Sequence, residues 1–362
     1  MRVHQITYGM MRGDAISTHV LEIDARLRAW GYETAIYAQH IAPELAGRVQ
    51  PDRAFAPFVA AAHDLIIFHY SIYSPNTRLF RAARGRKLLI YHNITPPEFF
   101  DNWDPQQAAL CELGRQTLQT LRDCDLALGD SDYNRRELVE AGFPEERTGV
   151  LPILFGPDRF GGEPDGRLLD QLRSTGDAHW LTVGRVVPNK ALEDVVRVFY
   201  LYTRYIQPKA HLHIVGSRYI AAYDAALAEL IADLGLMDQV SLVNRVNDAA
   251  LAAYYRAAHL YLCASQHEGF CVPLVESMHF GVPILARATT AVPETLGTAG
   301  VLFTELGYEA VAEMAHLLVT DVPLRKRVIA RQQARAIELG PDKAEAALRA
   351  ALRRLGLPAG AD

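Results

Sequence analysis

Residues 264–281 read ASQHEGFCVPLVESMHFG and connect a strand-like run to a helical one. The run LYLCAS at 260–265 is typical of a buried strand, and the apolar residues from Leu274 to Phe280 predict a helix that closes at Gly281. A loop between a sheet strand and the next helix is where open α/β sheets bind ligands, because the first amides of that helix have no intrahelical partner. The stretch therefore predicts an α/β fold with a ligand site in this loop.

Two glutamates mark the stretch, Glu268 in the loop and Glu276 in the first turn of the helix. Carboxylates in these positions can accept hydrogen bonds from vicinal hydroxyls, which a hexose and a ribose both offer. Other glutamates eight residues apart occur in charged segments of the chain, so the spacing alone indicates only surface carboxylates. The residues around the pair decide its interpretation.

A second motif precedes the first by about eighty residues. The run HWLTVGR at 179–185 is a buried-strand pattern, and a helix with apolar periodicity begins near residue 191. Gly184 lets the backbone turn sharply, so that Arg185 and Lys190 can project from one loop toward a common point. An arginine can bind two phosphate oxygens and a lysine acts as a mobile point charge. The pair suits a diphosphate, whereas either residue alone would be read as a surface cation.

The two motifs together resemble those of retaining glycosyltransferases of family four, the glycosyl transferases group 1, which have the GT-B fold. Gly-Arg-x-x-x-x-Lys is matched at 184–190, and Glu-Gly-Phe-x-x-Pro-Leu-x-Glu-Ser-Met is matched at 268–278. The resemblance runs in order along nearly the whole chain. It implies an α/β fold of two Rossmann-like parallel-sheet domains that face each other across a cleft, with a C-terminal helix that crosses back onto the first domain.

The resemblance also implies roles for single residues. Arg185 and Lys190 would hold and neutralise the diphosphate, Glu276 would bind the ribose, and Glu268 would orient the donor sugar with the amides of residues 270–272. The donor-binding residues expected on this basis are Gly13, Gly184, Arg185, Lys190, Glu268, Gly269, Phe270, Cys271, Val272, Leu274 and Glu276. The catalytic residues expected are His92, Glu268, Arg185 and Lys190, with no cofactor and no metal.

The N-terminal half contributes the two remaining members of these sets. Gly13 lies between the first strand and the first helix, where it could allow a phosphate or an acceptor to approach the helix amides. The family usually has paired glycines here, and only Gly13 aligns. His92 ends the strand-like run KLLIYHN, where it could bond a sugar hydroxyl or steady the reacting region. His69, one strand earlier, competes for that role.

An Asp-x-Asp pattern at Asp130 and Asp132 could be taken for a site of a divalent ion that bridges a diphosphate. Both residues lie where a helix is predicted to begin, so we interpret Ser131 or Asp132 as the cap of that helix. Arg185 and Lys190 would already balance the charge of a leaving diphosphate. We therefore expect a metal-independent enzyme.

Length and composition exclude several classes of protein. The chain has 362 residues, of which 50% are hydrophobic and 22% charged, and a formal net charge of −5, so it can build two domains and is not typical of nucleic-acid-binding proteins. It has no apolar run of transmembrane length, no signal-peptide pattern and no G-x-G-x-x-G motif of a dehydrogenase. The four cysteines show no CxxC spacing, and we assign neither a disulfide nor a zinc site to them. We expect a cytoplasmic protein whose contact with the inner membrane face, if any, is peripheral.

Alternating strand and helix patterns divide the chain into two similar halves. We predict an acceptor-binding domain at 1–156, a nucleotide-sugar-binding domain at 157–340 and a C-terminal helix at 341–362. The stretch GVLPILFG at 149–156 is punctuated by proline and glycine and is predicted to be the linker. Helices are predicted at 307–339 and 343–355.

Five cations fall within the stretch 78–87, namely Arg78, Arg81, Arg84, Arg86 and Lys87. We favour the solvated face of a surface helix. The alternative is a patch for an anionic lipid or a polyprenyl-phosphate acceptor.

The sequence and its resemblance therefore predict transfer of a hexose from a nucleoside-diphosphate sugar, GDP-mannose or a UDP-hexose, to a glycan, lipid-linked or small-molecule acceptor with retention. The alternatives are an epimerase or phosphorylase with the GT-B fold, or a non-catalytic protein that binds nucleotide-sugars. No nucleic-acid partner is expected.

Overall fold

Two units make up the chain in the computed structural model, which describes residues 1–55, 63–154, 156–305 and 307–359. The first unit comprises Met1–Glu98, Gln106–Gly156 and Leu339–Asp362, and the second comprises Phe99–Pro105 and Pro157–Glu338. The break after Gly156 lies at the end of the stretch interpreted as a linker. The segment Phe99–Pro105, which the sequence placed with the first half, belongs to the second unit.

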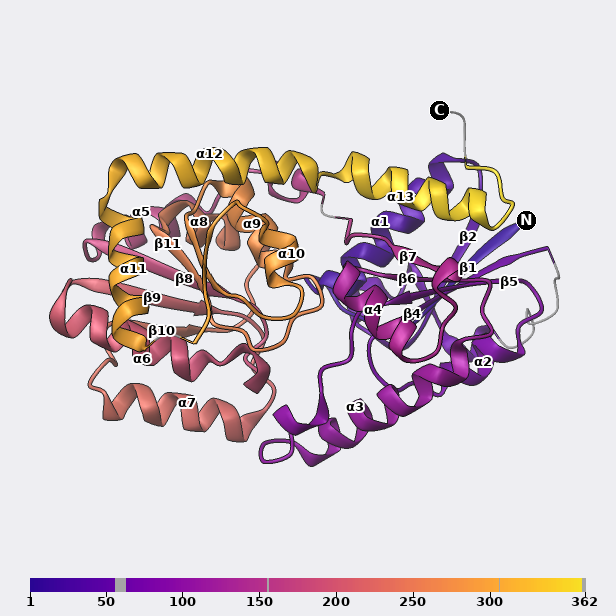
Figure 1. Ribbon diagram of the computed structural model, residues 1–362, viewed down its shortest axis with the longest axis horizontal. Coiled ribbons are helices and arrows are strands. Elements are labelled where there is room, and N and C mark those ends of the chain that lie inside the picture. Colours follow the sequence, from indigo (N-terminus) through magenta and orange to yellow (C-terminus); the bar gives the residue numbers. More distant parts are fainter. Residues whose placement is uncertain (56–62, 155, 306, 360–362) are drawn as a thin grey trace. The chain divides into compact units, whose positions relative to one another are not determined.

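The described strands of the first unit form one parallel sheet of seven strands in the order β3-β2-β1-β4-β5-β6-β7. They are β1 (Arg2–Met10), β2 (Glu33–Ile41), β3 (Val49–Pro51), β4 (Leu65–Tyr70), β5 (Arg86–Tyr91), β6 (Leu126–Gly129) and β7 (Thr148–Val150). The α-helices connected to them are α1 (Ala15–Ala29), α2 (Asn76–Ala82), α3 (Pro105–Leu118), α4 (Asp132–Glu140) and α13 (Pro341–Arg354) (Figure 1).

The second unit has a parallel sheet of six strands in the order β10-β9-β8-β11-β12-β13. Its described strands are β8 (Ala178–Val183), β9 (Ala210–Val215), β10 (Val240–Val243), β11 (Leu260–Cys263), β12 (Ile284–Arg287) and β13 (Val301–Phe303). Its helices are α5 (Gly166–Ser174), α6 (Leu192–Tyr205), α7 (Ala221–Asp233), α8 (Asp248–Ala257), α9 (Val272–Phe280), α10 (Val292–Leu296), α11 (Tyr308–Thr320) and α12 (Val322–Glu338) (Figure 1).

The predicted fold class, two Rossmann-like parallel-sheet units, is confirmed. Parallel strands covered by helices on both faces are buried throughout, and every residue of β4 is buried accordingly. This burial explains why unbroken apolar runs, rather than alternating ones, identified the strands of both halves.

Short elements differ from the sequence interpretation. The stretch 149–156 contains the end of β7, and Leu151 and Leu154 are fully buried, while residue 155 lies outside the described residues. The helix predicted over 307–339 is two helices, because Asp321 ends α11 and its carboxylate accepts a hydrogen bond from the amide of Leu324. A three-residue strand is too short to show a periodic pattern of apolar residues in the sequence, and a helix break of one residue does not interrupt such a pattern visibly.

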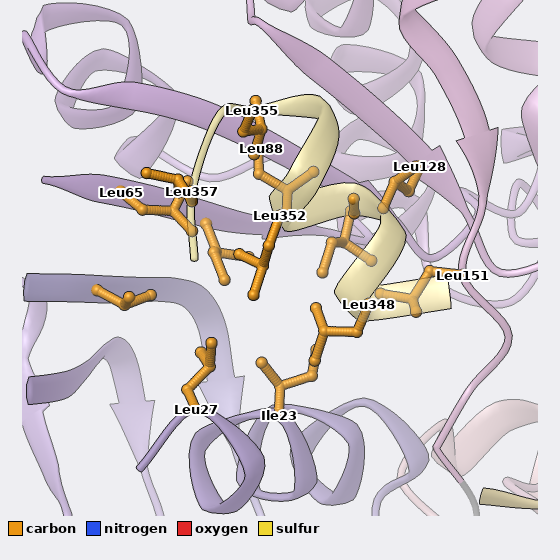
Figure 2. Close-up of a cluster of buried hydrophobic side chains, with 14 of the residues drawn as sticks. Ile23, Leu27, Leu65, Leu88, Leu128, Leu151, Leu348, Leu352, Leu355 and Leu357 are labelled. Carbon is orange, nitrogen blue, oxygen red and sulfur yellow. The ribbon is translucent and has the colours of Figure 1, made fainter. Parts of the chain in front are cut away.

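Helix α13 completes the core of the first unit. Its buried residues Ala344, Leu348, Ala351 and Leu352 recur at helical spacing and form one apolar stripe. Figure 2 shows Leu348 and Leu352 packed among Ile23 and Leu27 of α1 and leucines of the sheet. The last helix of the chain is thus part of the hydrophobic core that the first half of the chain forms.

Among the described residues, no helix is both long enough and apolar enough to cross a membrane.

Candidate functional site

The two sequence motifs meet at one point of the second sheet. Strand β8 has β9 on one side and β11 on the other, so the strand order reverses direction between β8 and β11. Ligands of open α/β sheets bind outside the carboxyl ends of the strands at such a switch point. Gly184 follows β8, and Ser265 lies two residues beyond the end of β11. The fold therefore places both motifs where a ligand is expected.

One backbone hydrogen bond and one side-chain hydrogen bond connect the two loops. The amide of Gln266 donates to the carbonyl of Asn189 at 2.8 Å, and the Asn189 side chain donates to the carbonyl of His267 at 3.0 Å. Asn189 is only 3% exposed. A buried side chain that satisfies a loop carbonyl fixes the relative positions of the cationic and acidic motifs.

Lys190 and Glu268 form the central ion pair. The Lys190 Nζ atom donates to Glu268 Oε1 at 2.5 Å, and Ser265 Oγ donates to the same oxygen at 2.7 Å. Burial alone would raise the pKa of Glu268 and lower that of Lys190, but their mutual attraction outweighs burial and shifts both pKa values the opposite way. Both groups therefore carry their charges.

Gly184 and Gly216 allow the β8 and β9 loops to approach closely. Gly184 has a φ of 147°, and a Cβ atom on Gly216 would lie 1.7 Å from the carbonyl oxygen of Gly184. Side chains would force these loops apart. Gly184, which the sequence predicted at the site, is therefore needed for the close approach of the two loops. Gly216 is a second glycine with this role, and the sequence interpretation did not single it out.

Arg185 is exposed on the same loop, and its Nη1 atom donates to the Tyr219 hydroxyl at 3.1 Å. Its charge also acts on Lys190, whose pKa it lowers slightly against the larger effect of Glu268. The structure thus brings the two predicted cations into electrostatic contact, although Arg185 is directed toward Tyr219.

Glu276 is 3% exposed and already has partners at both carboxylate oxygens. Oε1 accepts from Arg159 Nη1 at 2.9 Å, and Oε2 accepts from the Tyr255 hydroxyl at 2.7 Å. Burial raises the pKa of Glu276, and the Arg159 charge only partly opposes that rise. Arg159 also binds Asp248 at 2.6 Å. Sequence reasoning missed Arg159 and Tyr255, because neither lies in a motif.

The start of α9 has an unusual backbone. Cys271, the residue before the helix, has a φ of 68°, and Ala191 and Thr290 of the same unit have φ values of 47° and 46°. Residues other than glycine rarely adopt this conformation, and strained residues gather at functional sites. Ala191 follows Lys190, and Thr290 Oγ1 accepts from the amide of Glu268 at 2.8 Å. The strained positions therefore surround the central ion pair.

The other predicted residues of this loop differ in their exposure. Gly269 and Val272 are half-buried, whereas Phe270 and Leu274 are buried in the unit. The amide of Leu274 donates to the carbonyl of Cys271 at 3.0 Å, and the carbonyl of Phe270 accepts from Thr295 Oγ1 at 2.6 Å. Leu274 and Phe270 thus shape the loop from the core side.

The segment Phe99–Pro105 reaches this part of the second unit. The Phe99 ring lies 6.2 Å from the ring of His267, next to Glu268, and the Trp103 ring meets Tyr223 edge-on at 5.2 Å. The Tyr223 hydroxyl in turn accepts from the amide of Leu192 at the start of α6. Phe99 thereby contacts the acidic motif loop, and Trp103 contacts the tyrosine that binds the start of α6. No local sequence pattern predicts either contact.

In the first unit, His92 belongs to a buried chain of four side chains. Its Nδ1 atom lies 2.9 Å from Asp130 Oδ2, and its Nε2 atom lies 2.9 Å from His69 Nδ1. The second ring nitrogen of His69 lies 2.9 Å from Gln5 Oε1. The His92 ring is fully buried, so both of its nitrogens are engaged inside the unit. His69, the competing candidate, is its direct partner.

The hydrogen bonds of this chain require one proton beyond those of neutral histidines. Gln5 Oε1 can only accept, because the amide nitrogen of Gln5 donates to the carbonyl of Val20 at 3.1 Å. Three bonds need three hydrogens, and two neutral imidazoles supply two. Burial lowers the pKa of His69 well below its usual value and raises that of Asp130.

The remaining predicted positions lie in the first unit as well. Gly13 has a φ of 74° and precedes Asp14, which caps α1 by accepting from the amide of Ser17. Ser131 caps α4 by accepting from the amide of Asn134 at 3.1 Å, which confirms the capping interpretation of that motif. In the stretch 78–87, Arg78, Arg81 and Arg84 are exposed, while Arg86 and Lys87 are half-buried in β5.

A cluster of histidines in the second unit makes stability depend on pH. Burial lowers the pKa of His179 to about 4 and of His213 to about 3, and their rings share a hydrogen bond of 3.0 Å. His211 and His259 stack on His179, and Tyr254 lies against His213. An unfolded histidine binds a proton below about pH 6.5, whereas these two stay neutral in the folded state until lower pH.

We expect the free energy of unfolding of the second unit to be constant above about pH 6.5 and to fall below it by about 1.4 kcal/mol per pH unit for each of these two histidines. Denaturant unfolding at a series of pH values measures this slope. The His213→Gln variant keeps a hydrogen-bonding side chain but cannot take up the proton. The slope of its free energy of unfolding against pH is therefore expected to be smaller by the contribution of one histidine, about 1.4 kcal/mol per pH unit. An unchanged slope in this variant would contradict the assignment.

A family model for glycosyl transferases group 1 matches residues 170–335, which contain both motif loops of the second unit. Over this stretch, the chain is similar to the glycosyl transferases group 1 family. This is the family that the two motifs resemble.

Curated relatives agree with this assignment. The O-antigen chain mannosyltransferase B of Escherichia coli is 25% identical over 223 residues, which cover 60% of this chain and 58% of that protein. The D-inositol 3-phosphate glycosyltransferase of Geodermatophilus obscurus is 30% identical over 196 residues, covering 51% of this chain and 43% of that one. The chain thus spans about half the length of the curated relatives that it matches.

Solved structures share the fold over almost the whole chain. Anabaena Alr3699/HepE, crystallised with UDP and glucose, superposes with a TM-score of 0.79 over 98% of this chain and 99% of its own, at 17% identity. Such a low identity establishes the fold alone. The architecture of this chain is GT-B.

Proposed function

We propose that this chain is a retaining glycosyltransferase that moves a hexose of the mannose or glucose type from a nucleoside-diphosphate sugar to a glycan, lipid-linked or small-molecule acceptor. The observation that carries the proposal is the buried Lys190 and Glu268 pair at the switch point of the second sheet, with Nζ and Oε1 2.5 Å apart. An ammonium and a carboxylate at that point present one group for a phosphate and one for a sugar hydroxyl.

In this proposal Lys190 and Arg185 stabilise the diphosphate as it leaves. A lysine held in its charged form by Glu268 is ready to neutralise the oxyanion that develops when the glycosidic bond to phosphate breaks. Arg185 turns from Tyr219 to bind a second phosphate oxygen. These two cations replace the divalent ion that other glycosyltransferases use, so the reaction is metal-independent.

The glutamates orient the donor. Lys190 and Ser265 both bind Oε1 of Glu268, and in this proposal the second carboxylate oxygen accepts from a hydroxyl of the donor sugar. Glu276 accepts from the ribose hydroxyls with the lone pairs that Arg159 and Tyr255 leave available. Retention follows from front-face attack, in which the leaving phosphate takes the proton of the acceptor hydroxyl. A nucleophilic carboxylate is not needed in this route.

We assign His92 to a positioning role. Both of its ring nitrogens are engaged by Asp130 and His69, so it steadies the ends of β4, β5 and β6 rather than offering a free nitrogen to a sugar. Gly13 lies at the start of α1, where it gives an acceptor access to the helix amides.

Donor identity is proposed from the relatives. A mannosyltransferase from Escherichia coli is among them, which favours GDP-mannose, and the superposed structure from Anabaena holds UDP, which keeps a UDP-hexose as the second candidate. We propose a cytoplasmic enzyme whose contact with a membrane, if it has a lipid-linked acceptor, is peripheral.

The test is calorimetric titration of the full chain with UDP, GDP and ADP, in EDTA and in magnesium. We expect one nucleotide to bind equally well in both buffers, and the corresponding mannose or glucose donor to be consumed with acceptor present. If no nucleotide binds, the assigned site is wrong. If binding requires magnesium, metal independence is wrong, and the Asp130 and Asp132 pattern becomes the alternative site.

A further inference from the structure

Two cysteines and a glutamate converge beside the central ion pair. Cys263 is the last residue of β11 and Cys271 precedes α9, and their Sγ atoms lie 4.0 Å apart. The carboxylate of Glu268 completes a set whose three ligand atoms all lie within 4.8 Å of one another. The residues are 2%, 6% and 8% exposed, respectively. Three soft or anionic donors thus face one small volume in the interior of the second unit.

The spacing of the sulfur atoms suits a shared metal ion better than a disulfide. Zinc binds thiolate sulfur at about 2.3 Å with tetrahedral angles, which places two sulfur ligands about 3.8 Å apart. A disulfide requires about 2.0 Å. The observed 4.0 Å needs a shift of a few tenths of an ångström for the first arrangement and a much larger one for the second.

The backbone supports a role for the sulfur of Cys271. With a φ of 68°, this residue occupies a conformation in which glycine is free of strain and a side chain is not. Strain of this kind persists where the surrounding structure or a function maintains it.

Charge balance favours a divalent cation at this point. Two thiolates and the Glu268 carboxylate carry three negative charges, of which a divalent cation neutralises two. Ser265 Oγ accepts from Cys263 Sγ at 3.4 Å and is placed to serve as a fourth, neutral ligand. Binding forms two metal–sulfur bonds and releases the two thiol protons to solvent.

We propose that Cys263, Cys271 and Glu268 form a binding site for a thiophilic divalent cation of the zinc class, which competes with Lys190 for the Glu268 carboxylate. The competition follows from the 2.5 Å contact between Lys190 Nζ and Glu268 Oε1, since a cation bound to the same carboxylate would lie close to the ammonium and repel it. An occupied site displaces Lys190 and opposes binding of a nucleotide-sugar. This last consequence rests on the proposed function.

Cadmium is the probe, because its bonds to thiolate sulfur give an ultraviolet charge-transfer absorption that imidazole and carboxylate ligands do not. Titration of the full chain with Cd²⁺ is expected to show one equivalent bound with two thiolate ligands, and Zn²⁺ is expected to displace it. In Cys271→Gly, which also relieves the backbone strain, and in Cys263→Ser, the affinity is expected to fall by about 100-fold.

Matched controls come from the first unit, where Cys111 and Cys124 are also buried free thiols. The double variant Cys111→Ser with Cys124→Ser is expected to bind cadmium as the unaltered chain does. Absence of a stoichiometric charge-transfer signal, or the same signal in Cys271→Gly as in the unaltered chain, would overturn the site.

Competition with Lys190 is measured separately from nucleotide binding. Lys190→Met removes the competing ammonium and is expected to bind cadmium about tenfold more tightly. Unchanged or weaker binding in this variant would overturn the competition. Calorimetry with UDP and GDP on the cadmium-loaded chain then tests the consequence. If cadmium lowers the affinity for the nucleotide, and does not do so in Cys271→Gly, the result supports the competition with nucleotide binding. If nucleotides fail to bind even the metal-free chain, the proposed function is overturned, and the metal site is then judged by the cadmium titration alone.

Discussion

Ending the chain after Glu338 is expected to unfold the first unit, although all seven described strands of its sheet would remain in the sequence. The cut removes α13 and with it Leu348 and Leu352, which are fully buried against Ile23 and Leu27 of α1 (Figure 2). Replacing one buried leucine by alanine typically lowers the free energy of unfolding by about 3 kcal/mol. Losing the whole stripe exceeds the total stability of about 5–15 kcal/mol that domains possess.

Point variants give the graded form of this prediction. Leu348→Ala and Leu352→Ala are each expected to lower the free energy of unfolding of the first unit by about 3 kcal/mol. Ile337→Ala is the matched control, because Ile337 lies on α12 and is 81% exposed, and it is expected to change the free energy by less than about 0.5 kcal/mol. Denaturant unfolding and limited proteolysis measure both. Similar losses in the control and the core variants would show that α13 is not part of the core.

The second large effect is expected for Lys190→Ala. Removing the ammonium leaves the Glu268 carboxylate buried without its partner, which lowers the free energy of unfolding of the second unit by about 3 kcal/mol. The same change removes the cation proposed to bind the diphosphate, so the affinity for the nucleotide that binds the unaltered chain is expected to fall by about 100-fold or more. Denaturant unfolding and calorimetry measure the two losses independently.

A double variant separates stability from binding. Lys190→Met with Glu268→Gln removes both charges, so stability is expected to recover while nucleotide binding does not. Arg197→Ala serves as a matched control, since Arg197 of the same unit pairs with Asp194 at 3.6 Å and is 43% exposed at its side chain. It is expected to change neither property measurably. Recovery of nucleotide binding in the double variant would exclude Lys190 from the diphosphate site.

Much of the fold could be predicted because parallel strands are buried on both faces. DLIIFHY, KLLIYHN and LYLCAS are largely apolar runs. Strands β4 and β11 lie within the first and the last of them, and β5 begins one residue before the second. The short edge strands β3 and β7 and helix α5 have no comparable pattern, and they were missed for that reason.

The two loops of the candidate site could be located from local sequence, because polar residues follow the end of each buried strand within a few positions. Their partners could not. Arg159 meets Glu276 across 117 residues, and His69 meets His92 across 23, through side chains that only the packed sheet brings together. The pairing of Cys263 with Cys271 was missed because a spacing of eight residues has no motif associated with it.

By itself the sequence determined the class of fold, the resemblance to a family and the two loops of the candidate site, since these depend on local burial patterns and on residues that lie close together in the chain. Only the tertiary structure decided which charges are paired, which thiols meet and which unit each segment joins. Phe99–Pro105 lies in the first half of the sequence but belongs to the second unit. Helix α13 follows the second half of the sequence but belongs to the first unit. The physical reason is that burial and hydrogen-bond satisfaction are properties of the packed chain, in which residues far apart in sequence compete for the same interior space.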